Sequence, residues 1–249
     1  MREWTTGVAL VWTATAIMAA CAVLWAGRSR RRGLARSVAG VLGCGLWIAA
    51  EWGLHDPLAS MTQYTAGLMV MGQVVPPFLL LAMPAGGFML NRGGWLRDPM
   101  VALVLFAGLG VATGLPSVLD RSLANALFSA PLALLGMFTG LLFWAQILPG
   151  VRVLKSDFLV GVLVLVGSLP MTVIAVIWMV SSHVLYAPYL DVLCRWDLTP
   201  LQDQRWAGFV MLLAGMPLQI VGLCSLLLGG GQHEGQASWM ASGKPERGA

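Results

Sequence analysis

Charge is the scarcest property of this sequence. Of its 249 residues, only 10% are Asp, Glu, Lys or Arg, whereas 58% are hydrophobic. An ordinary soluble domain is about a quarter charged, so a soluble fold could not bury this much apolar surface. The composition therefore predicts an integral membrane protein whose apolar side chains are covered by membrane lipid.

Paired cysteines are missing as well. The four cysteines, Cys21, Cys44, Cys194 and Cys224, contain no CxxC or CxxxC pair. This spacing excludes a thioredoxin-type motif and gives no support to a zinc knuckle or a disulfide scaffold. Three of the four lie within apolar segments, where a thiol behaves as a small hydrophobic side chain.

Several motifs of known chemistry are absent. The sequence has no Walker motif, no GxSxG and no HExxH, and its last apolar segment lacks the lysine that a retinal Schiff base would need. The net charge is +4, but the basic residues lie in short loops between apolar segments, which is typical of topology signals and not of a nucleic-acid surface. We therefore expect neither an enzyme nor a nucleic-acid-binding protein.

The long apolar segments predict an all-α bundle of about seven transmembrane helices, because about 20 apolar residues cross a bilayer. Together they would form one transmembrane domain, residues 1–228. The glycine-rich polar segment 229–249 is expected to be a disordered cytoplasmic tail. The expected spans are residues 4–26, 38–54, 65–84, 99–115, 124–148, 158–182 and 206–228.

Lys and Arg residues are distributed unequally between the two sides of this bundle. Eleven of the fifteen follow the first, third and fifth spans or lie in the tail. By the positive-inside rule, that side is cytoplasmic, which places the N-terminus outside and the C-terminus inside. The strong basic cluster follows the first span instead of preceding it, so this span is not expected to be a cleaved signal peptide.

Residues 186–204 form the longest expected loop, and it faces the outer side. Long loops with aromatic and charged residues on a compact scaffold often carry function. Thr199 and Pro200 have the pattern of an N-cap followed by proline at the first helical position. Asp203 and Gln204 would then lie in the first turn of the last helix, where Asp203 would favour the positive end of that helix's dipole.

Two groups of residues are candidate metal ligands. His55 and His183 both fall on the outer side and could face one pocket, or they could be unrelated interfacial histidines. Met61 and Met69 belong to a group of methionines around the third span. Thioethers select Cu(I), but ordinary packing explains methionines equally well.

One acid lies near the outer end of an expected span. Glu51 is a functional candidate because an ionisable group at membrane depth is costly. The alternative is a carboxylate at the membrane interface beside aromatic residues, and the polar residues His55 and Asp56 that follow favour it.

Proline and glycine spacing inside two spans has more than one interpretation. Pro76 and Pro77 remove helical hydrogen bonds and predict a kink in the third span, which could line a cavity or be a simple bend. Gly136 and Gly140 have the GxxxG spacing of a helix-packing motif.

Three groups of segments together resemble a known family. They are residues 56–58, 75–80 and 83–84 (DPL, VPPFLL and MP), residues 140–144 (GLLFW), and residues 186–189 with 201–211 (YAPY and LQDQRWAGFVM). This pattern is similar to the CtaG-like family of cytochrome c oxidase assembly factors, the seven-helix family linked to the caa-type oxidases. The last group, which opens the final helix, is the most specific.

The resemblance implies an assembly or accessory factor for a respiratory haem–copper oxidase in the bacterial inner membrane. Its partners would be oxidase subunits, membrane lipid and an extracytoplasmic copper chaperone, and an assisting role in copper insertion is the finer expectation. The residues implied are Tyr186, Asp203, Gln204 and Gly208, with His183 as a metal ligand. The alternatives are a permanent accessory subunit of the oxidase or a membrane copper carrier.

The sequence departs from the family in one respect. Family members carry histidines before the double proline and before the GLLFW segment, whereas residues 63–68 and 131–135 here contain none. We therefore expect that copper binding through these histidines is lost and the scaffold is kept. The alternative is a weaker replacement site, which would be formed by Met61, Met69, Tyr64 and His183.

Overall fold

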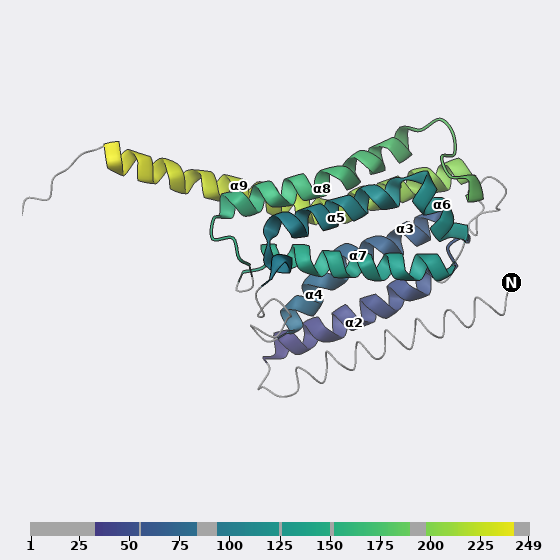
Figure 1. Ribbon diagram of the computed structural model, residues 1–249, viewed down its shortest axis with the longest axis horizontal. Helices are drawn as coiled ribbons and strands as arrows, with labels where there is room; N and C mark the ends of the chain where they lie inside the picture. The colour runs from purple at the N-terminus through teal and green to yellow at the C-terminus, as the bar shows by residue number, and fades with distance from the viewer. Residues whose placement is uncertain are drawn as a thin grey trace, which may run out of the picture.

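The computed structural model describes residues 33–54, 56–83, 94–124, 126–149, 152–189 and 198–241. Within these ranges the chain is helical and has no β-strand, and the long helices lie side by side along one direction (Figure 1). The α-helices are α2 Leu34–Leu54, α3 Met61–Met69, α4 Val75–Ala82, α5 Pro99–Gly114, α6 Pro116–Ala124, α7 Ala126–Ile147, α8 Asp157–Val180 and α9 Pro200–Ala241, and a π-helix, Val70–Val74, joins α3 to α4.

Four helical segments are long and apolar enough to cross a membrane: α2, the continuous segment Met61–Ala82, α8, and Pro200–Leu227 of α9. Two shorter apolar helices, Pro99–Gly114 and Pro131–Ile147, lie among them. The prediction of an all-helical membrane protein is confirmed. The expected first span, residues 4–26, lies outside the described residues, so the count of seven spans stays a prediction.

Two helices differ from their expected bounds. α6 occupies residues that we expected to form a loop; it begins with Pro116, which suits the first helical position because its missing N–H has no helical acceptor there. α9 continues as a helix to Ala241, although we expected a disordered tail from residue 229. Extending an existing helix adds a hydrogen bond per residue without a new nucleation cost. This extension projects beyond the end of the bundle (Figure 1).

The third span is not a regular α-helix. Its π-helix ends at Val74, and Pro76 and Pro77 lie in the first turn of α4. Prolines have no N–H and cannot donate hydrogen bonds to the preceding turn. The wider π turn therefore lies where the regular helical hydrogen bonds are already interrupted. The kink that the sequence predicts is realised here as a π-helical segment.

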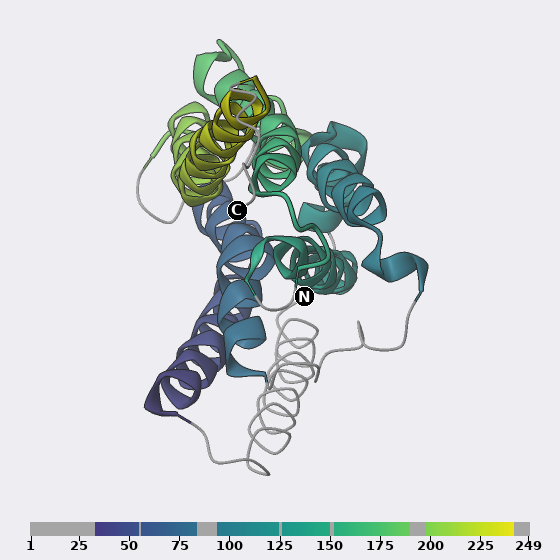
Figure 2. The same cartoon turned by 90° about the vertical axis from the view of Figure 1, so that its left-hand side faces the viewer.

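Helices α8 and α9 form a closely packed pair, seen from the end of the bundle in Figure 2. A Cβ atom added to Gly161 would lie 2.8 Å from the carbonyl oxygen of Gly222, so the two backbones approach very closely. The amide of Gln219 also donates a hydrogen bond to Thr172 Oγ1 across the pair at 2.7 Å. Small residues and interhelical hydrogen bonds are what hold helices together in lipid.

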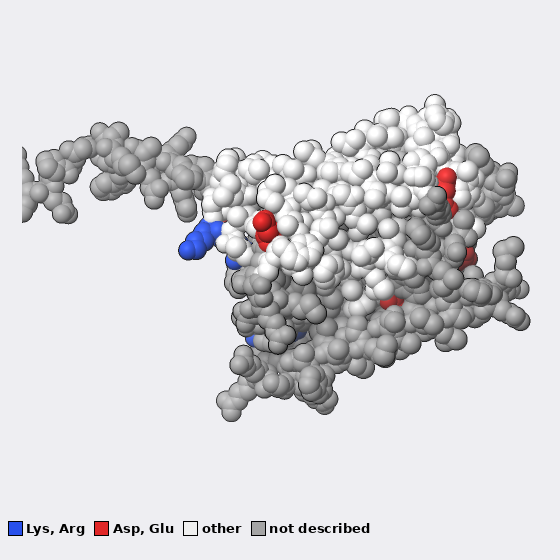
Figure 3. Space-filling model, viewed as in Figure 1, with Lys and Arg blue, Asp and Glu red and all other residues white. Residues whose placement is uncertain are grey.

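Several basic side chains lie at one end of the described bundle, although Arg205 is exposed at the other end. In the view of Figure 3, the visible Lys and Arg atoms lie at one end of the bundle, and the middle of its flank shows no charged atoms, while Asp or Glu atoms are visible toward both ends. Arg152 and Lys155 directly precede α8 at this end. The opposite end, where α8 stops and α9 starts, contains Tyr186, Asp203 and Gln204.

Candidate functional site

A buried carboxylate joins the start of α9 to the start of α3. Asp203 is 1% exposed, and its Oδ2 accepts a hydrogen bond from the backbone N–H of Met61 at 2.6 Å. Its Oδ1 accepts from the backbone N–H of Thr62 at 3.2 Å, from the hydroxyl of Thr62 at 2.6 Å and from the hydroxyl of Ser60 at 2.9 Å. The negative charge therefore lies at the positive end of α3.

This arrangement differs from what the sequence predicts for Asp203. The residue lies in the first turn of α9 as predicted, but its carboxylate caps α3 and not its own helix. The start of α9 already has a local cap, because the Gln202 N–H donates to Thr199 Oγ1 at 3.3 Å and the Thr199 N–H donates to Gln202 Oε1 at 3.1 Å. This reciprocal capping box makes Asp203 available for a contact with another helix.

Gln204, which is fully buried, binds the segment that follows α8. Its Oε1 accepts a hydrogen bond from the Leu185 N–H at 2.8 Å. Its Nε2 lies 3.4 Å from the carbonyl oxygen of Trp178 and 3.5 Å from that of His183. The last four carbonyls of a helix have no partner within that helix, so Gln204 caps the end of α8 from the side.

Tyr186 makes the corresponding contact to α5. Its hydroxyl donates a hydrogen bond to the carbonyl oxygen of Gly114, the last residue of α5, at 2.9 Å. Its ring packs edge-on against Trp178, with centroids 5.4 Å apart. Burial raises the pKa of the Tyr186 phenol well above its usual value near 10, so the hydroxyl stays a neutral donor at physiological pH.

Gly208 lies about one turn after Gln204 and faces α8. A Cβ atom at this position would lie 2.7 Å from the carbonyl oxygen of Ala175 and 2.9 Å from Cγ of Met179. Only a hydrogen atom fits this space. The absence of a side chain therefore brings the start of α9 against α8 and keeps Gln204 within reach of the end of that helix.

Asp203, Gln204 and Tyr186 together form a cluster that we call the terminal clamp. It joins the start of α9 to the start of α3 and to the ends of α8 and α5. Its chemistry is hydrogen bonding between buried side chains and the unpaired ends of helices. Such contacts fix the relative positions of four helices at one end of the bundle.

Two of the residues expected to bind a metal lie too far apart to do so together. Met61 and Met69 lie at opposite ends of α3, about 12 Å apart along the helix axis, so they cannot share one ion. His183 is exposed in the segment after α8, and His55 lies outside the described residues. The described part of the chain contains no group of three or more His, Cys, Asp or Glu side chains that could hold a metal.

Glu51 is buried among its neighbours in the bundle. The residue is 4% exposed, and its Oε1 accepts a hydrogen bond from the indole N–H of Trp47, one turn earlier in α2, at 2.7 Å. One of the aromatic residues beside Glu51 is thus its hydrogen-bond donor.

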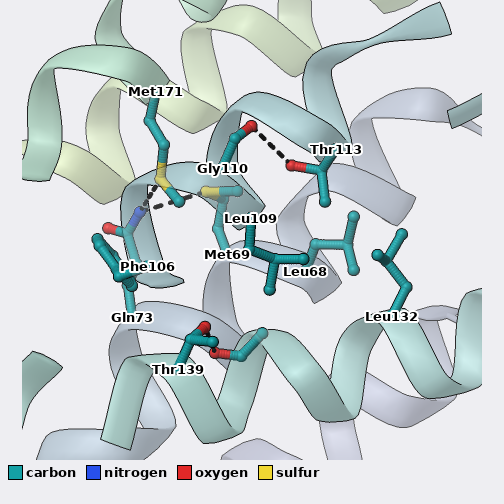
Figure 4. A pocket seen from close by; sticks show the side chains of 12 residues that line it. Leu68, Met69, Gln73, Phe106, Leu109, Gly110, Thr113, Leu132, Thr139 and Met171 are labelled. Atoms are coloured by element: carbon teal, nitrogen blue, oxygen red, sulfur yellow. Dashed lines mark hydrogen bonds between the residues drawn. The ribbon is translucent and has the colours of Figure 1, made fainter. Parts of the chain in front are cut away.

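A small cavity lies between the π-helix, α5, α7 and α8 (Figure 4). Its volume is about 30 Å³, and Gln73, Met69 and Met171 lie together on its wall. Nε2 of Gln73 lies 2.7 Å from Sδ of Met171 and 3.5 Å from Sδ of Met69. Gln73 is 4% exposed, and its Oε1 has no hydrogen-bond partner among the described residues. The kink expected in the third span therefore lines a cavity.

Two sets of residues in these sites were not identified from the sequence. Ser60 is the N-cap residue of α3 and accepts a hydrogen bond from the Gln63 N–H at 3.3 Å. The spacing of Ser60 and Gln63 is that of a capping box, so the sequence contains a signal that could have identified Ser60. The contact of Gln73 with Met171 joins residues 98 positions apart. Its only local signal is a polar residue inside an apolar span.

These observations define a helical membrane protein whose helix ends are joined by buried polar side chains. The chain belongs to the cytochrome c oxidase caa3 assembly factor (Caa3_CtaG) family, whose model matches residues 19–229. The resemblance found in the sequence is thus confirmed. Neither the curated proteins nor the solved structures include a match to this chain.

Proposed function

We propose that this chain is a non-catalytic membrane scaffold that holds components of a respiratory haem–copper oxidase during assembly. The observation that carries the proposal is the terminal clamp. Tyr186 lies at the start of the expected outer loop, residues 186–204, while Asp203 and Gln204 lie at its end. Because the clamp fixes four helix ends, this end of the bundle keeps a constant shape that a partner protein could bind.

The distribution of charge supports an orientation for this scaffold. Arg152 and Lys155 precede α8, whereas the terminal clamp lies where α8 ends. Because basic residues are retained on the cytoplasmic side, the clamp and its loop would face away from the cytoplasm. With the expected first span, this orientation gives an external N-terminus and a cytoplasmic C-terminus in the bacterial inner membrane.

The partners follow from this orientation and from the family. An outward loop would meet oxidase subunits and an extracytoplasmic copper chaperone on the side where copper enters the enzyme. In this proposal the scaffold assists copper insertion by positioning proteins. Met61 and Met69 lie at opposite ends of α3, which favours positioning over a metal site built from both residues.

The clamp can be tested by replacing Asp203→Ala in cells that express the oxidase. We expect oxidase activity in isolated membranes to fall several-fold at an equal level of the scaffold, because the start of α9 is no longer fixed to α3. Asp157→Ala is the matched control, since it removes a partly exposed ion pair with Arg152 (N–O distance 2.6 Å), which contributes little to stability. Normal oxidase activity with normal protein levels in Asp203→Ala would contradict the proposal.

The nature of the association can be tested by affinity purification from native membranes in mild detergent. An assembly factor leaves its product, so we expect oxidase subunits or a copper chaperone in less than equimolar amounts. A constant one-to-one ratio would favour a permanent accessory subunit. Recovery without any respiratory partner would reject both and leave a membrane copper carrier as the function to test.

A further inference from the structure

Two thioether sulfurs from different helices point at the same atom inside the bundle. Met69 ends α3 and Met171 lies in the middle of α8, and both Sδ atoms are directed at the side-chain amide of Gln73 in the π-helix (Figure 4). The site is remote from the terminal clamp along the helices. The scaffold function above does not use these side chains.

We propose that this cavity is a binding site for one Cu(I) ion, held by the sulfurs of Met69 and Met171 and the side-chain oxygen of Gln73. This inference goes beyond the scaffold role and does not depend on it. Nε2 of Gln73 lies 2.7 and 3.5 Å from the two sulfurs, so both sulfurs face one polar group between the helices. A movement of this side chain would leave its place to an ion that contacts both sulfurs.

The amide of Gln73 is suited to two states of such a site. Its NH2 group faces the sulfurs, and its Oε1 is buried without a hydrogen-bond partner among the described residues. A buried acceptor without a partner is destabilising. Rotation about the terminal side-chain torsion, which is soft, would turn the oxygen toward a cation and give it a partner.

The ligands select the type of ion. Thioethers bind soft ions and, among biological metals, favour Cu(I). A single positive charge also costs less to bury than a double charge, because the cost of removing an ion from water rises steeply with its charge. The described cavity wall carries no carboxylate or imidazole, which disfavours Zn²⁺ and Mn²⁺.

The π-helix explains how the sequence places Gln73 at this point. The segment Val70–Val74 widens the helix between α3 and α4, and inserted π turns of this kind occur frequently at functional sites. On the α7 side of the cavity, Gly136 has no side chain to fill the space. No atom outside its own helix lies within 4 Å of where its Cβ would be. Backbone irregularity and a missing side chain together leave room beside the two sulfurs.

The test is a titration of the purified full-length protein in detergent with Cu(I), under anaerobic reducing conditions and in competition with a chromophoric Cu(I) chelator. We expect the Met171→Leu and Met69→Leu variants to bind one equivalent fewer than the wild type, or to bind it at least tenfold more weakly. All variants keep the four cysteines, so any binding by thiols is common to them. Met-to-Leu exchange nearly conserves side-chain volume, so folding is expected to persist.

Two further variants separate this site from other methionines. Met211→Leu replaces a buried methionine of α9 that does not line the cavity and should bind as the wild type does. Met61→Leu should also bind normally, because Met61 lies at the far end of α3. Gln73→Met supplies a third thioether and should tighten binding, which gives a result that misfolding could not imitate.

X-ray absorption of the copper-loaded wild type should show sulfur neighbours whose number falls in Met171→Leu. Equal binding by the wild type and by both Met69→Leu and Met171→Leu would overturn the site, as would loss of binding in Met61→Leu alone. If the copper site fails while Asp203→Ala still lowers oxidase activity, the scaffold role stands. The reverse pattern would leave a copper-binding protein without an assembly function.

Discussion

Tyr186 shows how much one hydroxyl contributes at the end of the bundle. Its bond to the Gly114 carbonyl fixes the segment after α8 to the end of α5. We expect Tyr186→Phe to leave that carbonyl without its partner and to lower the free energy of unfolding by about 1 to 3 kcal/mol. A thermal melt of the purified protein in detergent would measure this loss, and an unchanged melting temperature would contradict the bond.

The same residue gives a pH dependence with a definite sign. Because burial raises the folded-state pKa of Tyr186 above its unfolded value near 10, the folded protein holds this proton where the unfolded chain has lost it. Its contribution to stability is therefore complete below pH 10 and declines as the pH rises beyond that value.

The measurement is the melting temperature of the wild type and of Tyr186→Phe between pH 8 and about pH 11. The wild type should lose stability faster than the variant above pH 10. Since all other titrating groups are common to both proteins, the difference isolates the phenol. Parallel curves would show that Tyr186 ionises in the folded protein as it does in the unfolded chain.

At the scale of elements, α9 contains two glycines with opposite surroundings. Gly208 faces the backbone of α8, whereas no atom outside its own helix lies within 4 Å of where the Cβ of Gly215 would be. We expect Gly208→Ala to push α9 away from α8 at a cost of about 1 to 3 kcal/mol and to weaken the contacts of Gln204. Gly215→Ala should be neutral or stabilise by up to about 1 kcal/mol through helix propensity.

Both variants can be compared by thermal melting and by oxidase activity in membranes. If Gly208→Ala melts like the wild type, the close approach of α8 and α9 is not required. A loss in Gly215→Ala as large as that in Gly208→Ala would show that the effect comes from α9 itself and not from its packing.

The contact of α7 with the π-helix gives a second matched pair. A Cβ at Gly140 would overlap the carbonyl oxygen of Gly72, whereas Gly136 borders the cavity and has no such neighbour. A backbone atom cannot rotate away, so we expect Gly140→Ala to destabilise the protein by about 3 kcal/mol or more. Gly136→Ala should be tolerated. Yields and melting temperatures after purification would rank the two, and equal behaviour would refute the asymmetry.

At the scale of the whole molecule, the orientation in the membrane can be measured with single cysteines in a background without the four native ones. Thr199→Cys and Lys155→Cys replace exposed residues at opposite ends of α8 and α9. A maleimide that cannot cross membranes should label the cysteine at position 199 in intact cells, and the one at position 155 only after permeabilisation, because basic residues stay inside. The opposite pattern would reverse the orientation, and labelling of both in intact cells would reject the expected topology.

The sequence by itself determined that this is a helical membrane protein of the oxidase assembly family. Hydropathy is a local property, because each span must cover its own backbone polar groups and meet lipid with apolar side chains. The start of α9 was equally local, since Thr199, Pro200 and Gln202 encode the cap within four residues. The same reasoning placed Asp203 in the first turn of α9. It assigned the carboxylate to the dipole of that helix, whereas the carboxylate caps α3.

Only the tertiary structure decided which distant groups meet. Asp203 reaches Met61 across 142 residues, and Gln73 reaches Met171 across 98. In the GxxxG spacing Gly136 and Gly140 are equivalent, whereas packing makes Gly140 a tight contact and Gly136 the border of a cavity. These outcomes depend on how whole helices settle against one another, because a buried polar group takes whichever partner the packing brings within hydrogen-bond distance.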